Sequence, residues 1–438
     1  MKNNMLKFTS FFLTVFLILT GCKKEETFKR AYYKTVYDVY NTHVNLSSFN
    51  QKDLDNLFPG FSALAVSLHK DFDRDAKYLN EDYNFFNNLK VVNDAYGTGQ
   101  TIKVSDNLFY VLKLSMKMFE LTEGYFNPAL GSLIDIWNPK FEYTSFDSEE
   151  MFMNNDPNAL MINKALNCVP TYNELKTILI LNEERKEITF NSLNRCDGRV
   201  ILSLGAIGKG YAMDKLKEYY LSNTSTSGSI DGGSSSLLTI GNNPNKREGK
   251  DGAYDNYWNI EIKAPYPNQH ERLFIYQNKG DLAVSTSGNS VKYFYLVDDS
   301  GNKLCQGTSG FRICDEYEVP IRRTHILNPF TGYPENYYDN ITIISKQASA
   351  GVLDALTTAI YNVGDFETVK RIIKNVETYF NVEIDYYFGK MVEVEYLTEY
   401  DSIGKKLKVS MIVNDSMNEK IDDLNENLIK EKNVINLD

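Results

Sequence analysis

The chain has 438 residues, of which 42% are hydrophobic and 13% aromatic, so it can bury at least one core and is not disordered throughout. Its 47 basic and 58 acidic residues leave a formal net charge of -11, which argues against a nucleic-acid partner because such binding requires Lys and Arg to neutralise phosphates. With 5 Cys, 4 His and neither a C-x-x-C nor an H-E-x-x-H pattern, we expect no zinc site, iron–sulfur cluster or disulfide-built fold, and any bound metal should have oxygen ligands.

Residues 1–21 have the pattern of a secretory signal peptide, with lysines ahead of an apolar stretch (8–19) that is short for a membrane span. The segment ends in the letters LTGC, which resemble the lipobox of bacterial lipoproteins, where the Cys becomes the lipidated first residue of the mature chain. The alternative is an ordinary cleaved signal followed by an accidental Cys. We expect residues 22–28 to be a linker from lipidated Cys22, and the protein to be exported and held at the membrane by that lipid.

Residues 32–46 are rich in aromatic and β-branched side chains and predict a first strand. Ser105 is the predicted N-cap of an amphipathic helix that ends near Leu121, with Gly124 as the stop signal. Residues 142–170 are polar and rich in Asn, which indicates an insertion.

The second half mixes strands and helices without strict alternation, so we predict an α+β fold in one large, two-lobed domain over residues 29–413. Residues 177–182 and 187–190 predict a hairpin, followed by a strand near Val200 and a helix from about Ile207. Further predicted elements are strands at 258–264, 272–277, 281–286, 291–297, 340–346, 382–389, 391–397 and 406–413, and a helix at 350–363. The polar residues 414–438 are expected to form a frayed tail.

A glycine-rich segment, LGAIGKGYA at residues 204–212, enters the predicted helix. Glycines let the backbone approach a ligand, and free N–H groups at a helix N-terminus favour a phosphate. The spacing matches neither a Walker loop nor the dinucleotide fingerprint, so a plain structural turn is the alternative. Asp214, one turn further along, could reach a ribose or base, or be an ordinary solvated carboxylate.

In the helix predicted at 350–363, Asp354 and Thr358 are four residues apart and should project from the same side. A carboxylate and a hydroxyl can meet one hard cation such as Mg²⁺, with a third ligand supplied by a carbonyl of the glycine-rich turn. A solvent-facing polar side of the helix is the alternative.

His325 ends a predicted strand, a position suited to proton transfer or a phosphate contact, although such a His often bonds only to backbone. Residues 230–236 and 285–289 are small, hydroxyl-bearing segments that could admit a flat ligand or be simple turns. Cys305 and Cys314 could pair or remain free thiols.

These segments occur in an order that resembles the ApbE family, the FAD:protein FMN transferases, over roughly residues 123–364. The matching blocks are GYFNPALGSLIDIWN (124–138), LGAIGKGYAMDKL (204–216), SIDGGSSSLLTIG (229–241), AVSTSGN (283–289), HILNPFTGYP (325–334) and DALTTA (354–359). The resemblance implies a two-lobed α+β body with FAD in a cleft between the lobes and Mg²⁺ at the FAD pyrophosphate.

The resemblance also implies roles for individual residues. The metal ligands would be Asp354, Thr358, Thr357 and the carbonyl of Ala206. The expected catalytic residues are Asp354 and His325, the latter as the base that deprotonates the acceptor or as a phosphate contact. The FAD contacts would come from Asn127, Trp137, Lys209, Asp214, Ile341 and Ser203, the last standing where many members have Asp.

The implied reaction is Mg²⁺-dependent transfer of FMN from FAD to a Thr or Ser hydroxyl of an exported acceptor protein, with release of AMP. One alternative is an FAD pyrophosphatase, in which water replaces the hydroxyl and free FMN results. Another is a lipoprotein that binds FAD without catalysis, which Ser203 and an altered first strand would suggest.

Overall fold

The computed structural model describes residues 28–78, 87–141, 153–233, 235–250, 252–266, 271–315, 318–397 and 403–435. The predicted signal peptide and Cys22 lie outside these ranges, so both stay predictions. Residues Ala31–Asp438 form one compact unit. Within the described ranges, no helix combines the length and the apolar character that crossing a membrane requires.

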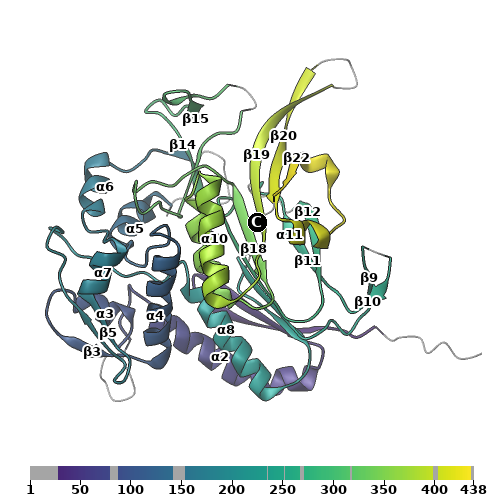
Figure 1. Cartoon of the computed structure of the whole chain (residues 1–438), viewed down its shortest axis with the longest axis horizontal. Helices are drawn as coiled ribbons and strands as arrows, with labels where there is room; N and C mark the ends of the chain where they lie inside the picture. The colour runs from purple at the N-terminus through teal and green to yellow at the C-terminus, as the bar shows by residue number, and fades with distance from the viewer. Residues whose placement is uncertain are drawn as a thin grey trace, which may run out of the picture. The chain divides into compact units, whose positions relative to one another are not determined.

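A nine-stranded sheet forms the centre of this unit, in the order β1-β2-β7-β8-β13-β18-β19-β20-β22. Figure 1 labels its strands β18, β19, β20 and β22. Its strands are β1 (Tyr32–Val39), β2 (Thr42–Ser48), β7 (Gly228–Asp231), β8 (Ser236–Ile240), β13 (Leu282–Gly288), β18 (Asn340–Ser345), β19 (Asp385–Leu397), β20 (Ile403–Val413) and β22 (Ile429–Val434). Neighbouring strands are antiparallel, except that β22 runs parallel to β20.

The two faces of the sheet belong to different hydrophobic cores. Along β13, Ala283 lies in a core shared with helices, whereas Leu282 and Val284 lie in a core shared with a small sheet, as the two-residue period of a strand requires. The helices with residues in the first core are α2 (Gln51–Phe72), α3 (Leu89–Asp94), α4 (Asp106–Leu121), α7 (Tyr172–Ile178), α8 (Gly208–Asn223), α9 (Ala350–Tyr361) and α10 (Phe366–Phe380). The small sheet consists of β11 (Trp258–Lys263), β12 (Arg272–Asn278) and β21 (Ile421–Asp422).

A third apolar cluster surrounds Trp137 and Phe294. It is built on α5 (Gly131–Trp137), α6 (Ala159–Leu166) and β14 (Tyr293–Leu296). The remaining elements are β3 (Thr101–Lys103), η1 (Asn138–Lys140), β4 (Met153–Asn154), β5 (Leu179–Asn182), β6 (Glu187–Phe190), β9 (Arg247–Glu248), β10 (Tyr254–Asp255), β15 (Leu304–Gly307), β16 (Gly310–Ile313), β17 (Arg322–Thr324), α11 (Asp415–Lys420) and η3 (Glu426–Leu428).

The α+β class is confirmed, and several local predictions hold. Ser105 caps α4, its Oγ accepting the Leu108 N–H at 3.0 Å, and Gly124 follows the helix with a φ of +94°. Strands β5 and β6 form the predicted antiparallel hairpin. Helix α9 begins at the predicted residue and ends at Tyr361.

The first predicted strand is two strands instead of one. Tyr40 and Asn41 take positive φ angles of 55° and 58°, and the chain reverses there into the β1–β2 hairpin. The pattern of aromatic and β-branched residues runs through the turn unbroken, which is why it does not mark the reversal. The strand expected near Val200 is also wrong: Val200 is fully buried, but its backbone is not in a strand.

The expected frayed tail is wrong for residues 414–435. Strand β22 pairs with β20, and β21 pairs with β12. Met417, Ile421 and Leu428 are buried in the core under the small sheet. Three widely spaced apolar side chains are enough to dock this polar segment, because the sheet already presents an apolar face and a free edge to it.

Both pairs of cysteines in the described part of the chain are disulfides, Cys168–Cys196 and Cys305–Cys314. Cys305 and Cys314 are therefore paired and are not free thiols.

Two of the long helices, α10 and α2, lack any counterpart among the predicted elements. In α10 the buried Val369, Ile372, Ile373 and Val376 follow helical spacing, so the sequence does carry their signal. In α2 the buried side chains also recur at helical spacing, but Pro59 lies inside the helix and obscures the pattern.

Candidate active site

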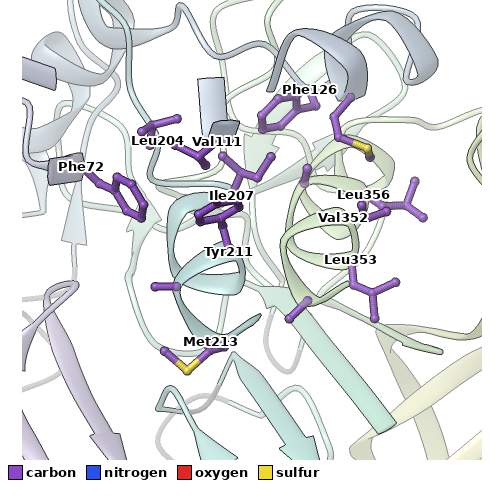
Figure 2. Close-up of a cluster of buried hydrophobic side chains, with 14 of the residues drawn as sticks. Phe72, Val111, Phe126, Leu204, Ile207, Tyr211, Met213, Val352, Leu353 and Leu356 are labelled. Atoms are coloured by element: carbon purple, nitrogen blue, oxygen red, sulfur yellow. The ribbon is translucent and has the colours of Figure 1, made fainter. Parts of the chain in front are cut away.

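The glycine-rich turn leads into α8, which begins at Gly208 as the sequence predicts, and lies against α9. A Cβ at Gly210 would lie 2.3 Å from the Ala350 carbonyl oxygen, so the two helix backbones touch where only glycine fits. Figure 2 shows apolar side chains of the surrounding core, among them Tyr211 of α8 and Val352 of α9. The glycines thus bring the N-terminus of α8 onto the first turns of α9.

Asp354 projects from α9 toward this N-terminus and is 6% exposed. Its Oδ2 accepts the Gly210 N–H at 3.1 Å, and its Oδ1 lies 3.5 Å from the Ser285 Oγ of β13. Burial raises the pKa of Asp354 above its ordinary value, and the positive charge of Lys209 opposes that rise. The site therefore holds a desolvated carboxylate whose charge is only partly balanced.

Hydroxyl groups gather beside this carboxylate. Thr357 Oγ1 lies 2.9 Å from Ser287 Oγ and 3.4 Å from Ser285 Oγ, and donates to the Asp354 carbonyl at 3.0 Å. The sequence pairs Asp354 with Thr358, but in the structure it is the Thr357 hydroxyl that meets the serines beside Asp354. Thr357 is fully buried, whereas Thr358 is half-buried. Thr357 and Thr358 come three and four residues after Asp354, so both lie near its side of the helix. Only the position of β13 decides which of the two hydroxyls meets the cluster.

This oxygen-rich cluster fits a hard cation. Within the described ranges, no three or more His, Cys, Asp or Glu side chains form a possible metal centre. Mg²⁺ needs no such centre, because it is commonly held by one or two carboxylates together with substrate phosphates and water. Ala206 lies in the turn just before α8, so its carbonyl as a further ligand stays a prediction, as does the hydroxyl of Thr358.

Lys209 connects the parts of the site. Its Nζ donates a hydrogen bond to Ser235 Oγ, and its charge acts on both Asp354 and His325. The carbonyl of Ser235 accepts the Thr286 N–H at 2.8 Å, which ties this turn to β13. Ser235, Asp354 and His325 are far apart in the sequence, but all three therefore interact with the ammonium group of Lys209.

His325 follows β17 directly, and part of the residue is exposed at the surface. Its Nδ1 lies 3.4 Å from the Lys292 carbonyl oxygen and 3.2 Å from Thr324 Oγ1. The surrounding protein, together with the charges of Lys292 and Lys209, lowers the pKa of His325 to about 4. The imidazole is accordingly neutral at neutral pH.

Asp214 is only partly exposed, and both of its carboxylate oxygens bind backbone of the protein. Its Oδ1 accepts the Ala350 N–H at 2.8 Å and its Oδ2 accepts the Gly351 N–H at 3.0 Å, so it caps α9. Burial raises its pKa to about 6. The two hydrogen bonds occupy the carboxylate that the sequence assigns to a cofactor.

Asn127 and Ser203 lie in adjoining loops. Asn127 Oδ1 accepts the Ala129 N–H, and its Nδ2 donates to the Pro170 carbonyl, both at 2.9 Å. The Ser203 N–H donates to the Pro128 carbonyl at 2.8 Å, which joins the glycine-rich turn to the Asn127 loop. These contacts are structural, and a direct contact of either side chain with FAD stays a prediction.

Trp137 and Ile341 lie in cores instead of lining an open surface. Trp137 is 1% exposed, packs against Phe294 and Tyr333, and donates from Nε1 to the Gly332 carbonyl at 2.9 Å. Ile341 is fully buried in the helix-side core. Their expected contact with FAD is untested, and in this structure their side chains pack against protein.

The sequence does not identify Ser285 and Ser287 as partners of the Asp354 cluster. The sequence places Ser287 in a small, hydroxyl-bearing segment, and Ser285 both in that segment and in the strand predicted at 281–286; both serines lie in β13. Two serines that alternate along an otherwise apolar strand point to one face, and this spacing is the signal that could have found them.

Solved structures show the same fold. An ApbE protein of Thermotoga maritima aligns over 86% of this chain and 97% of its own, with a TM-score of 0.57 and 22% identity. The flavin transferase ApbE of Vibrio cholerae aligns over the same shares with a TM-score of 0.54 and 17% identity. The fold is therefore of the kind found in ApbE flavin transferase structures.

Sequence comparison identifies the family. Residues 40–380 match the model of the ApbE family, and the chain belongs to this family. A relative named FAD:protein FMN transferase in Vibrio cholerae is 23% identical over 357 residues, which are 81% of this chain and 86% of that protein. Another of the same name in Treponema pallidum is 24% identical over 279 residues, which are 63% of this chain and 65% of that protein.

Proposed function

We propose that this protein is an FAD:protein FMN transferase that uses Mg²⁺ to move the FMN part of FAD onto a Thr or Ser hydroxyl of an exported acceptor protein. The hydroxyl oxygen attacks the FMN phosphorus, the phosphorus–oxygen bond to AMP breaks, and the hydroxyl proton passes to a base. The observation that supports this most is the Asp354 cluster, a desolvated carboxylate and hydroxyls against a glycine-rich helix N-terminus. Family membership supports it independently.

Asp354, Thr357, Thr358 and the carbonyl of Ala206 would hold the metal. When bound, a divalent cation neutralises charge on phosphate oxygens and on the leaving group. The remaining work of the protein is to bind and orient its two substrates, since phosphoryl transfer depends chiefly on position and electrostatics.

The start of α8 and Lys209 supply positive potential for the pyrophosphate of FAD. N–H groups at a helix N-terminus favour anions, and the Lys209 ammonium adds a full charge beside them. On the family pattern, we assign Asn127 and Ser203 to the walls around the flavin, and the buried Trp137 and Ile341 to the packing behind those walls.

His325 is suited to receive the acceptor's proton. A carbonyl oxygen only accepts hydrogen bonds, so the contact with the Lys292 carbonyl favours a proton on Nδ1 and leaves the lone pair on Nε2. Because its pKa is lowered to about 4, this nitrogen is unprotonated at neutral pH.

Export and lipidation of Cys22 are part of the proposal. The disulfides Cys168–Cys196 and Cys305–Cys314 support export, because such bonds persist mainly in oxidising compartments. Labelling with a radioactive fatty acid tests the anchor: cells should label the wild type, and Cys22→Ser should lose the label. Equal labelling of both proteins would disprove it.

The function is tested by incubating the purified chain with FAD and a candidate acceptor domain, with and without Mg²⁺. Chromatography follows AMP and free FMN, and flavin fluorescence of the denatured acceptor detects the covalent product. We expect Mg²⁺-dependent AMP release matched by acceptor-bound flavin. Asp354→Asn should lose at least about a hundredfold in rate, whereas Asp299→Asn, in an exposed turn, should match wild type.

The products separate the alternatives. AMP with free FMN, and no labelled acceptor, would show a pyrophosphatase. FAD that stays bound without AMP release, even with Mg²⁺ and an acceptor, would show a flavin-binding protein and overturn the enzymatic proposal.

A further inference from the structure

Helices α8 and α9 cap each other. The Ala350 and Gly351 N–H groups at the start of α9 donate to Asp214 of α8 at 2.8 and 3.0 Å. In return, the Gly210 N–H in the first turn of α8 donates to Asp354 of α9 at 3.1 Å. First-turn N–H groups have no partner within their own helix, so each helix supplies the carboxylate that the other one lacks.

The backbone contact between the helices makes this arrangement stiff. A Cβ at Gly351 would lie 3.1 Å from the Tyr211 nitrogen, and one at Gly210 would lie 2.3 Å from the Ala350 carbonyl oxygen. No side chain lies between the helices at this point to absorb a shift. A movement of the α9 N-terminus is therefore passed directly to Asp354, one turn further along the same helix.

The rest of the α9 N-terminus is also satisfied. The Val352 N–H donates to Ser349 Oγ at 3.2 Å, and the Leu353 N–H donates to the Ser349 carbonyl at 3.1 Å. Only the first two N–H groups depend on another helix, and both bind the same carboxylate.

From this geometry we infer that Asp214 is a positioning residue, which fixes α9 against α8 and thereby sets the place of Asp354. It acts through Ala350 and Gly351 and not through contact with FAD, in contrast to the cofactor contact that the family pattern implies. The consequence for metal binding rests on the proposed function, whereas the coupling between Asp214 and the Gly210–Asp354 hydrogen bond does not.

The test compares full-length wild type, Asp214→Asn, Gly351→Ala and the control Glu218→Gln. Asn offers one acceptor oxygen to two N–H groups, and Ala at residue 351 pushes α9 away from Tyr211 without changing any charge. Glu218 lies one turn beyond Asp214 on the same helix, with 64% of its side chain exposed beside Lys215. The readouts are hydrogen exchange of the Gly210 amide without metal, Mg²⁺ affinity, FAD affinity without Mg²⁺, and AMP release.

Both α8–α9 variants should exchange the Gly210 amide faster than wild type and bind Mg²⁺ about tenfold or more weakly. Their FAD affinity without Mg²⁺ should stay within about twofold, because no FAD contact is removed. Glu218→Gln should match wild type in every readout. If Asp214→Asn proves unfolded by circular dichroism, Gly351→Ala carries the same comparison.

Unchanged Gly210 exchange in Asp214→Asn, together with weaker FAD binding, would overturn the inference and return Asp214 to the cofactor. Failure of the proposed function looks different. Wild type would then release no AMP with Mg²⁺ and acceptor, while Gly210 exchange would still show whether Asp214 holds α9.

Discussion

At the scale of single residues, the surrounding protein and neighbouring positive charges set the protonation state of His325. Since its pKa is lowered to about 4, we expect kcat/KM to be flat near neutral pH and to fall as the pH drops toward 4 and the base becomes protonated. Removing the cation in Lys292→Met favours the protonated form, so the pKa should rise and the acidic limb should move to higher pH. A pH–rate profile measures the shift.

Lys279→Met is the matched control, because Lys279 is an exposed lysine paired with Asp255. An acidic limb that stays in place in Lys292→Met would contradict the assignment of His325 as the base. Circular dichroism at each pH separates titration from unfolding.

A second residue-scale prediction concerns Asp71, which is 2% exposed and has one carboxylate oxygen without a hydrogen-bond partner. Burial raises its pKa to about 6, partly offset by a hydrogen bond from Ser105. The folded state thus binds the proton more tightly than the unfolded state. The proton on Asp71 therefore stabilises the folded state below about pH 4, and this stabilisation is lost as the pH rises through 6.

Asp71→Asn removes this dependence. Relative to wild type, its free energy of unfolding should rise by roughly 2–3 kcal/mol between pH 4 and pH 7.5, as measured by urea denaturation. The control is Asp75→Asn, a nearby exposed carboxylate. If the difference in the free energy of unfolding between Asp71→Asn and wild type did not change with pH, the folded state would not raise the pKa of Asp71.

At the scale of elements, the packing of α8 on α9 depends on Gly210. Gly210→Ala places a methyl group 2.3 Å from the Ala350 carbonyl oxygen, and backbone cannot move aside as a side chain can. We expect a loss of about 3 kcal/mol in the free energy of unfolding and loss of activity, because Asp354 moves with α9.

Gly205→Ala is the control from the same turn, since its Cβ would meet nothing closer than Ser203 Oγ at 3.7 Å. It should change stability by less than about 0.5 kcal/mol. Equal effects of the two substitutions in denaturation curves would contradict the close helix contact.

At the scale of the whole molecule, the C-terminal segment is part of the fold. Met417 is fully buried between the large sheet and the small sheet, so Met417→Ala should cost about 2–4 kcal/mol. The exposed neighbour Glu419→Ala should cost less than about 0.5 kcal/mol. Urea denaturation measures the free energy of unfolding of both variants. A negligible effect of Met417→Ala would indicate that the C-terminal segment is frayed.

Local elements could be read from the sequence because their signals are local. The Ser105 cap, the β5–β6 hairpin and the start of α8 at its glycines all depend on neighbours within a few residues. The reversal at Tyr40–Asn41 and the docking of β22 could not be read in this way. The reversal needs positive φ angles, which the residue types Tyr and Asn at this place do not predict. The docking of β22 needs a sheet edge that another part of the chain contributes.

By itself, the sequence determined the α+β class and the family pattern, and that pattern predicts Asp354, Lys209 and His325 for one site, because the residue types and their order carry that information. Only the tertiary structure decided that Thr357, not Thr358, meets the serines beside Asp354, and that Asp214 caps α9. The physical reason is that helical spacing leaves two neighbouring positions equivalent until another element packs against one of them. A carboxylate likewise shows which N–H groups it binds only once two helices lie in contact.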